Sequence, residues 1–116
     1  MTISLEEIIN MDSRKRGQFI NALSGVKSAN LVGTKDKNGR ENLSIVNSVF
    51  HIGSNPPLLG FIQRPTTVER HTYENMVETK QYTFNAIGES FVDKAHQTAA
   101  RYEKNQSEFE AVGLVF

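Results

Sequence analysis

The sequence has 116 residues, enough for one domain. Thirteen basic and thirteen acidic residues give a net charge of zero, which argues against nucleic-acid binding and against a patch for anionic membranes. The absence of cysteine excludes disulfides, thiol catalysis and cysteine-ligated metals. Only 38% of the residues are hydrophobic, so a partner chain would help to complete the core.

Two short helices are predicted within residues 4–24. Ser4 and Glu7 form a capping box for the first helix, and Asp12 or Ser13 caps the second, which Gly25 is placed to end. Each helix has an apolar stripe, made of Leu5, Ile8 and Ile9 in the first and of Phe19, Ile20 and Leu23 in the second. Both helices are expected to pack against the domain. No stretch is apolar enough for a signal peptide or a membrane span, so a soluble cytoplasmic protein is expected.

A β-hairpin is predicted next. A strand runs from Ala29 to Asp36, and Asn38-Gly39 follows it. Both central residues of a type I′ turn need positive φ, which Asn-Gly adopts easily, so a type I′ turn is expected there. The chain should then return along a strand that starts at Arg40.

The stretch from Asn42 to Gln63 organises the chain. It predicts a long strand, a turn at Asn55-Pro56-Pro57 and a second strand from Leu58 to Ile62. The second strand is apolar throughout, which is typical of a strand covered on both faces. The first strand has Asn47 and Ser48 in its middle, so either a bulge lifts them out or a polar ligand lies along this segment. The alternative is a pair of hydrogen-bonded polar groups within the core.

The C-terminal part predicts one strand, one helix and a further strand. The strand runs from Tyr82 to Ile87, and Ser90 caps a helix that spans residues 90–104. The ending, Gly113 to Phe116, resembles the start of another strand. Strands without a closing partner leave open edges, so we expect a fragment, or a shortened relative that completes its sheet with another chain.

The segment between the predicted strands is rich in groups that bind phosphate. It contains Arg64, Thr66, Thr67, Arg70, His71 and Thr72. Guanidinium groups bind phosphate oxygens in a bidentate manner, and threonine hydroxyls add donors. Thr72 is expected to cap a helix over Tyr73 to Thr79, whose N-terminus would attract an anion. The segment therefore suits a phosphate monoester, and the alternative is an ordinary polar loop.

Catalytic machinery of the common kinds is missing from the sequence. His51, His71 and His96 lack the spacing of metal ligands. No nucleophile elbow, Walker loop or Rossmann glycine pattern is present, and no catalytic acid or base is assigned. Redox or group-transfer chemistry would therefore depend on an organic cofactor.

The order of these motifs resembles the flavin reductase-like family. The matching pieces are Asn38-Gly39, Asn42-Leu43, Asn55 to Leu59, Arg64, Arg70 to Asn75, and Tyr82 to Asn85, within a match over roughly Ser13 to Gly113. The resemblance implies a mainly β fold with flanking helices, an FMN-binding split β-barrel of antiparallel strands that is incomplete in this chain. It implies one domain over residues 1–116, with N-terminal helices over 4–24, barrel strands and phosphate loop over 28–88, and a C-terminal helix over 90–104.

The same resemblance implies a cofactor and its site. The cofactor would be FMN, with FAD as the other candidate, and NAD(P)H would be the electron donor of a homodimeric flavoprotein. The flavin ring would lie against Val46, Asn47, Ser48, Val49 and Phe50. The phosphate would contact Arg64, Thr66, Arg70, His71 and Thr72. Family members often have proline and serine where this chain has Ile45 and Asn47, and aspartate where it has His71.

Two main hypotheses follow from the resemblance. The leading one is an oxidoreductase of the flavin reductase type, which transfers hydride from NAD(P)H to flavin and passes electrons on to an acceptor. The rival is a non-enzymatic flavin-binding, storage or sensor module, because no nicotinamide site is identifiable in the sequence. A split-barrel enzyme that acts on another phosphate-bearing cofactor is a weaker third hypothesis.

Overall fold

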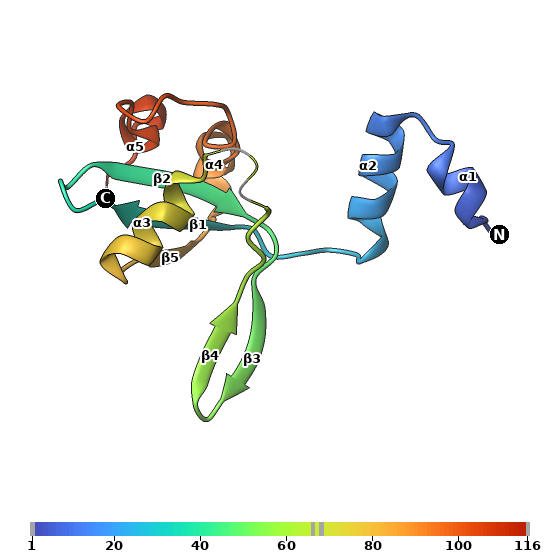
Figure 1. The fold of residues 1–116 in the computed structure, drawn as a ribbon, viewed down its shortest axis with the longest axis horizontal. Helices are drawn as coiled ribbons and strands as arrows, with labels where there is room; N and C mark the ends of the chain where they lie inside the picture. The colour runs from blue at the N-terminus through green and yellow to red at the C-terminus, as the bar shows by residue number, and fades with distance from the viewer. Residues whose placement is uncertain (1, 66, 68, 116) are drawn as a thin grey trace.

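The fold consists of two antiparallel sheets, of which the three-stranded one is flanked by helices (Figure 1). A computed structural model describes residues 2–65, 67 and 69–115. Its strands are β1 (Asn30–Lys35), β2 (Glu41–Val46), β3 (Phe50–Ser54), β4 (Pro57–Gly60) and β5 (Thr83–Ala86). One sheet has the order β2-β1-β5, and β3 and β4 form a separate hairpin. The predicted antiparallel strands with flanking helices are confirmed.

Along the sequence, two helices precede β1, one lies between β4 and β5, and the others follow β5. The helices are α1 (Leu5–Ile9), α2 (Ser13–Leu23), α3 (His71–Thr79), α4 (Val92–Gln97) and α5 (Glu108–Val112), with a 3₁₀ turn, η1 (Glu89–Phe91), before α4. The predicted capping box of Ser4 and Glu7 is present in α1. Asp12 caps α2, because its carboxylate accepts the amides of Arg14 and Lys15. The two N-terminal helices therefore begin as local sequence chemistry predicts.

The β1–β2 hairpin forms as predicted, but its turn is of another type. Gly39 has a φ of +80°, whereas Asn38 does not adopt a positive φ. The Asp36 carboxylate accepts the amide of Asn38 at 2.8 Å and that of Arg40 at 2.9 Å. Because this side chain holds the turn, one left-handed residue suffices, and the type I′ prediction is wrong.

One face of the three-stranded sheet forms the apolar core. Leu31 of β1 and Leu43 of β2 pack there against Ala95 of α4 and Phe109 of α5. These four side chains are all buried. The core thus joins the first sheet strands to the C-terminal helices.

The opposite face binds α3 through polar side chains. Asn42 Nδ2 donates to the Thr72 hydroxyl at 2.7 Å, and this hydroxyl donates to Ser44 Oγ at 2.8 Å. Asn75 Nδ2 donates to Thr34 Oγ1 at 3.1 Å. Four of these five residues, all except Ser44, are buried. Helix α3 is therefore positioned on β1 and β2 by directional hydrogen bonds between side chains.

Several C-terminal predictions differ from the structure. Thr72 does not cap α3, which begins at His71, two residues before the predicted start, and its hydroxyl is bonded to β2 instead. The predicted helix over residues 90–104 is limited to α4, and the Thr98 hydroxyl bonds the carbonyl of Ala95 at its end. Helix α5 was not predicted, and Gly113, with φ of +65°, ends it. Residues 113–115 form no strand.

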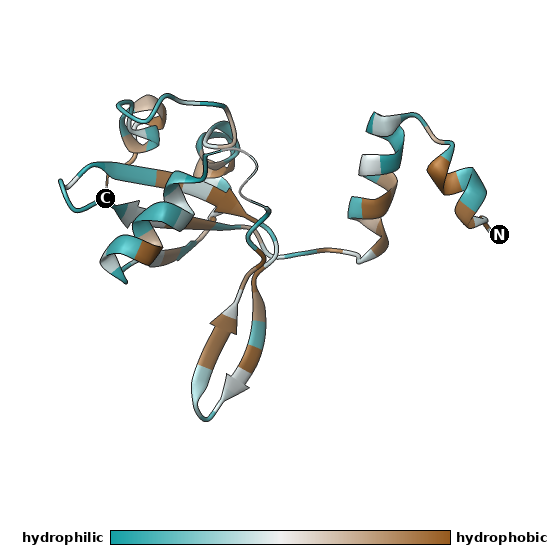
Figure 2. Ribbon diagram, viewed as in Figure 1, coloured by the Kyte–Doolittle hydropathy of each residue, from teal (hydrophilic) through white to brown (hydrophobic). Residues whose placement is uncertain are grey.

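The N-terminal helices and the β3–β4 hairpin extend away from the core (Figure 1). Neither α1 nor α2 has a buried residue, and Leu58 and Leu59 are 47% and 59% exposed. Figure 2 shows apolar residues along both the hairpin and these helices. The radius of gyration of 16.5 Å exceeds the roughly 13 Å of a compact domain of this length. Within the described residues, the predictions that both helices pack and that β4 is covered on both faces are therefore wrong.

The edge of β2 is protected by a carboxylate. Glu108, at the start of α5, accepts the main-chain amide of Leu43 at 3.0 Å, and its residue is only 9% exposed. Leu43 lies opposite Gly33 in the register with β1, and this amide points away from β1. Glu108 therefore binds an amide that would otherwise be buried without a partner.

We expect Glu108→Ala to lower the free energy of unfolding by about 1–3 kcal/mol, because it leaves the Leu43 amide unsatisfied. Urea denaturation followed by circular dichroism measures this change. Glu110→Ala is the matched control, since Glu110 lies exposed on the same helix, and it should shift stability by less than about 0.5 kcal/mol. Equal effects of the two substitutions would contradict the role of Glu108.

Candidate functional site

The long strand predicted from Asn42 is interrupted between β2 and β3. Residues Asn47, Ser48 and Val49 belong to neither strand. Their main-chain amides make no hydrogen bond to any residue that the structure describes, and the Asn47 side chain is exposed and likewise unbonded. The predicted bulge is not observed, because the strand stops at this point instead, and the alternative of a polar ligand along the segment stays a prediction. The end of β2 thus leaves a short row of main-chain donors that no described residue binds.

Ser48 joins this interruption to the chain that follows β4. The amide of Ile62 donates to Ser48 Oγ at 3.1 Å, and the Ser48 hydroxyl lies 3.4 Å from the Ile62 carbonyl oxygen. Arg64 follows two residues later, is exposed, and forms no ion pair with the described part of the chain. The first predicted patch, residues 46–50, and the start of the second are thus held side by side.

The second half of the predicted phosphate loop is packed against the rest of the domain. Thr72 is 8% exposed, and its hydroxyl is already bonded to Asn42 and Ser44. Arg70 Nε and His71 Nε2 are buried and have no hydrogen-bond partner among the described residues. His71 Nε2 lies 3.6 Å from the Glu69 carboxylate. These contacts give Thr72 a structural role, and the predicted phosphate contacts of this half stay predictions.

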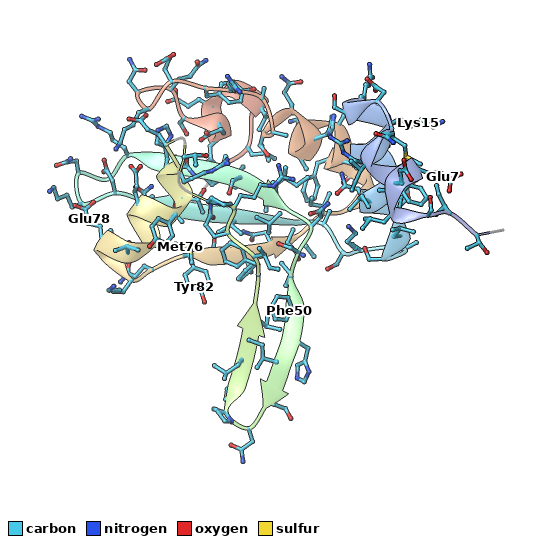
Figure 3. The ribbon with its side chains drawn as sticks, turned by 45° about the vertical axis from the view of Figure 1, so that its right-hand side comes forward. Glu7, Lys15, Phe50, Met76, Glu78 and Tyr82 are labelled. Atoms are coloured by element: carbon cyan, nitrogen blue, oxygen red, sulfur yellow. The ribbon has the colours of Figure 1, made fainter. Side chains whose placement is uncertain are left out.

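Thr66, the remaining residue of the predicted phosphate site, lies outside the described residues. Val46 ends β2 and Phe50 begins β3. Figure 3 shows Phe50 at the end of the hairpin nearest the sheet. Both therefore flank the free amides, and their predicted contact with a flavin ring stays a prediction.

His71 lines a small polar cleft between the β1–β2 turn, α3 and α5. Its lining consists of Asp36, Arg40, Glu41, Asn42, His71, Asn75, Lys104, Gln106 and Glu108. Beside the cleft, Lys104 Nζ donates to the Glu74 carboxylate at 3.1 Å, which lowers the pKa of Glu74 and raises that of Lys104. The Arg40 amide likewise lowers the pKa of Asp36. Sequence reasoning missed Asn42 and Glu108, since their partners are set by tertiary contacts.

Metal and membrane sites are not found in the part of the chain that the structure describes. No group of three His, Cys, Asp or Glu side chains there could hold a metal ion. No helix among these residues is long and apolar enough to cross a bilayer.

The sequence profile of the "Flavin reductase like domain" matches residues 26–115. The chain belongs to the flavin reductase-like family. This match covers both sheets, the interruption between β2 and β3, and the loop that leads to α3. A search of curated proteins finds no significant match.

Solved structures show the same fold. A protein from Shewanella frigidimarina, assigned as a flavin reductase with a split barrel domain, is 55% identical and superposes with a TM-score of 0.93. That match covers 99% of this chain and 57% of the Shewanella chain, so this chain spans just over half of its relative. The predicted split-barrel fold is confirmed, and within the described residues the two sheets form no closed barrel.

More distant structures agree in fold. Nitrilotriacetate monooxygenase component B from Bacillus cereus is 21% identical, with a TM-score of 0.79 over 97% of this chain and 55% of its own. Flavoredoxin from Desulfovibrio vulgaris is 23% identical, with a TM-score of 0.73 over 99% of this chain and 54% of its own. The split barrel therefore persists at low identity.

We expect Thr72→Val to lower the free energy of unfolding by about 1–3 kcal/mol, because it leaves the Asn42 amide and the Ser44 hydroxyl without their partner. Thermal denaturation measures the effect, and Thr67→Val, in the exposed loop, is the control. A Thr72→Val protein with unchanged stability would contradict the structural role. If such a protein also bound flavin more weakly, Thr72 would instead be a direct ligand.

Proposed function

We propose that this chain is the flavin-binding part of an oxidoreductase of the flavin reductase type. The observation that carries the proposal is the row of free main-chain amides at residues 47–49. A flavin ring presents oxygen and nitrogen acceptors along one edge, and such a row can bind them. Family membership supports flavin as the ligand class.

The residues around the interruption fit FMN. Asn47 has an unbonded amide side chain, and the Ile62 contact holds the Ser48 hydroxyl in place. Val46, Val49 and Phe50 supply apolar surface on either side of the free amides. These groups would bind the ring and hold its polar edge in one orientation. Fixed donors of this kind also stabilise negative charge on a reduced ring.

Arginine side chains are proposed to hold the phosphate. Arg64 follows the segment bonded to Ser48 and has no ion-pair partner among the described residues. Arg70 Nε also lacks a partner there, and a guanidinium binds a phosphate through several N–H groups at once. Thr72 positions α3, and through it Arg70 and His71, against β2. FAD would use the same ring site.

A bound flavin would supply the hydride-accepting and electron-passing chemistry, with NAD(P)H as the proposed donor. This chain supplies binding, orientation and charge stabilisation, and no residue is assigned as a catalytic acid or base. The rival function is a flavin-binding module without turnover. The chain spans 57% of the Shewanella protein, which leaves room for a nicotinamide site elsewhere in a full-length relative.

The double substitution Arg64→Ala/Arg70→Ala should weaken FMN binding by at least about a hundredfold, given about 1.5–3 kcal/mol for each charge-assisted hydrogen bond. Quenching of flavin fluorescence during titration with the protein measures the affinity. Arg14→Ala/Arg101→Ala is the matched control, because both arginines are exposed and lie outside the proposed site. Unchanged FMN affinity in the first variant would contradict the assignment of Arg64 and Arg70 as phosphate-binding residues.

A second experiment separates the enzyme from the binding module. The FMN-loaded chain is mixed with NADH or NADPH, and oxidation of the nicotinamide is followed by its absorbance. Turnover above that of free FMN is expected for the enzyme. FMN binding without turnover would support the module instead.

A homodimer is also proposed. Phe50, Ile52 and Leu59 are 48%, 57% and 59% exposed on the hairpin, and an isolated two-stranded hairpin is at best marginally stable in water. Light scattering coupled to size exclusion measures the mass, and a dimer is expected. The cytoplasmic location stays a prediction.

A further inference from the structure

A second groove lies at the other end of the three-stranded sheet, where α3 ends and β5 begins. It has a volume of about 440 Å³ and is lined by Thr34, Lys35, Lys80, Gln81, Tyr82 and Thr83. Volumes of 300–1,000 Å³ are usual for small-ligand sites. None of these six residues belongs to the proposed flavin site. The groove is therefore a separate feature of the fold.

The groove is positively charged. Its lining has two lysines and no carboxylate. Lys35 Nζ lies 3.3 Å from the Glu41 carboxylate, which offsets its charge. Lys80 forms no ion pair with any residue that the structure describes. The ammonium group of Lys80 is therefore the charge that an anionic ligand would meet.

The backbone of Lys80 is unusual. It has φ of +59° and ψ of +21°, a left-handed conformation at the C-terminus of α3. Glycine is the common residue at this position of a helix, because a side chain there is sterically disfavoured. Lysine thus occupies a position at which glycine would give the folded protein greater stability. Strained positions of this kind are found most often at functional sites.

Tyr82 supplies a flat apolar surface beside this charge. It is 49% exposed, and its ring meets that of Phe84 edge to face, with centroids 5.5 Å apart and an interplanar angle of 89°. In such a contact at least one face of the tyrosine ring is not covered by its neighbour. Figure 3 shows Tyr82 projecting outward from the sheet near the end of α3. A planar ring can therefore stack on it.

A polar group for a sugar or phosphate lies between these two residues. The side-chain amide of Gln81 offers a donor and an acceptor. The Thr83 side chain lies on the opposite face of β5, because the Tyr82 ring contacts Phe84 whereas the Thr83 hydroxyl accepts Asn85 Nδ2. A stacking surface, an amide and an ammonium group therefore follow one another along residues 80–82.

We propose that this groove binds a nucleoside monophosphate, with the base stacked on Tyr82 and the phosphate on Lys80. Gln81 contacts the ribose or the phosphate. The proposal is independent of flavin binding, since it involves other residues and a different part of the sheet.

The test is a titration of the full chain with adenosine monophosphate, followed by ¹H–¹⁵N NMR. Shifts of the amides of residues 80–83 are expected. Lys80→Met and Tyr82→Leu should each weaken binding about tenfold, through loss of one charged contact and of one stacked base. Lys27→Met is the matched control, because Lys27 is exposed and lies outside the groove, and it should leave affinity unchanged.

A further variant separates binding from folding. Lys80→Gly should raise the melting temperature, since glycine favours the left-handed backbone, and should still weaken adenosine monophosphate binding about tenfold. Adenosine and inorganic phosphate, titrated alone, should each bind more weakly than the nucleotide. Absence of shifts at residues 80–83 would overturn the proposal. Equal binding of phosphate and nucleotide, or full binding by Lys80→Gly, would overturn it too.

Discussion

The hydrogen bonds between α3 and β2 are the contact on which the rest of the arrangement depends. Asn42, Ser44 and Thr72 form one connected network, and each of its bonds needs a particular side of the strand to face the helix. A shift of β2 by one residue would turn these groups toward the apolar core. The network therefore fixes the register of β2, and with it the point at which the strand ends and the free amides begin.

The same network explains why the apolar core lies on one face only. Alternation along β2 places Leu43 toward α4 and α5, and its neighbours toward α3. Glu108 then connects α5 to the edge of the same strand through the Leu43 amide. Three helices and one sheet thus meet at a single strand of six residues. Substitutions in β2 should consequently affect the packing of α3 on one face of the sheet and that of α4 and α5 on the other.

Local chemistry made part of this fold predictable. The capping box at Ser4 and the Asp12 cap depend on residues three positions apart or fewer, so the sequence alone contains the interaction. The hairpin at Asn38-Gly39 was predicted for the same reason. Its turn type was missed because Asp36, outside the central dipeptide, supplies the hydrogen bonds. A turn prediction from two residues could not include that carboxylate.

Long-range partners account for what the sequence did not reveal. Thr72 looks like a helix cap, because a hydroxyl ahead of a helical pattern commonly bonds its first amides. Its actual partners are about 30 residues away in β2, and no local pattern identifies them. The polar pair at residues 47 and 48 could be singled out from the sequence, and its role in binding a flavin stays a prediction. Two hydrogen-bonding side chains in an apolar strand conflict with simple packing, and such conflicts are expected at functional sites.

In the exposed hairpin, the burial predicted from amino-acid composition differs from the burial observed in the structure. The apolar composition of β4 is typical of a strand that is covered on both faces. The exposed fractions of Leu58 and Leu59 reflect what the described residues bury by themselves. The same hairpin begins at Phe50, directly after the free amides, so a partner that covered it would also border the proposed flavin site. If the proposed dimer forms through this hairpin, dimer formation and flavin affinity should be linked, because both would involve the same segment.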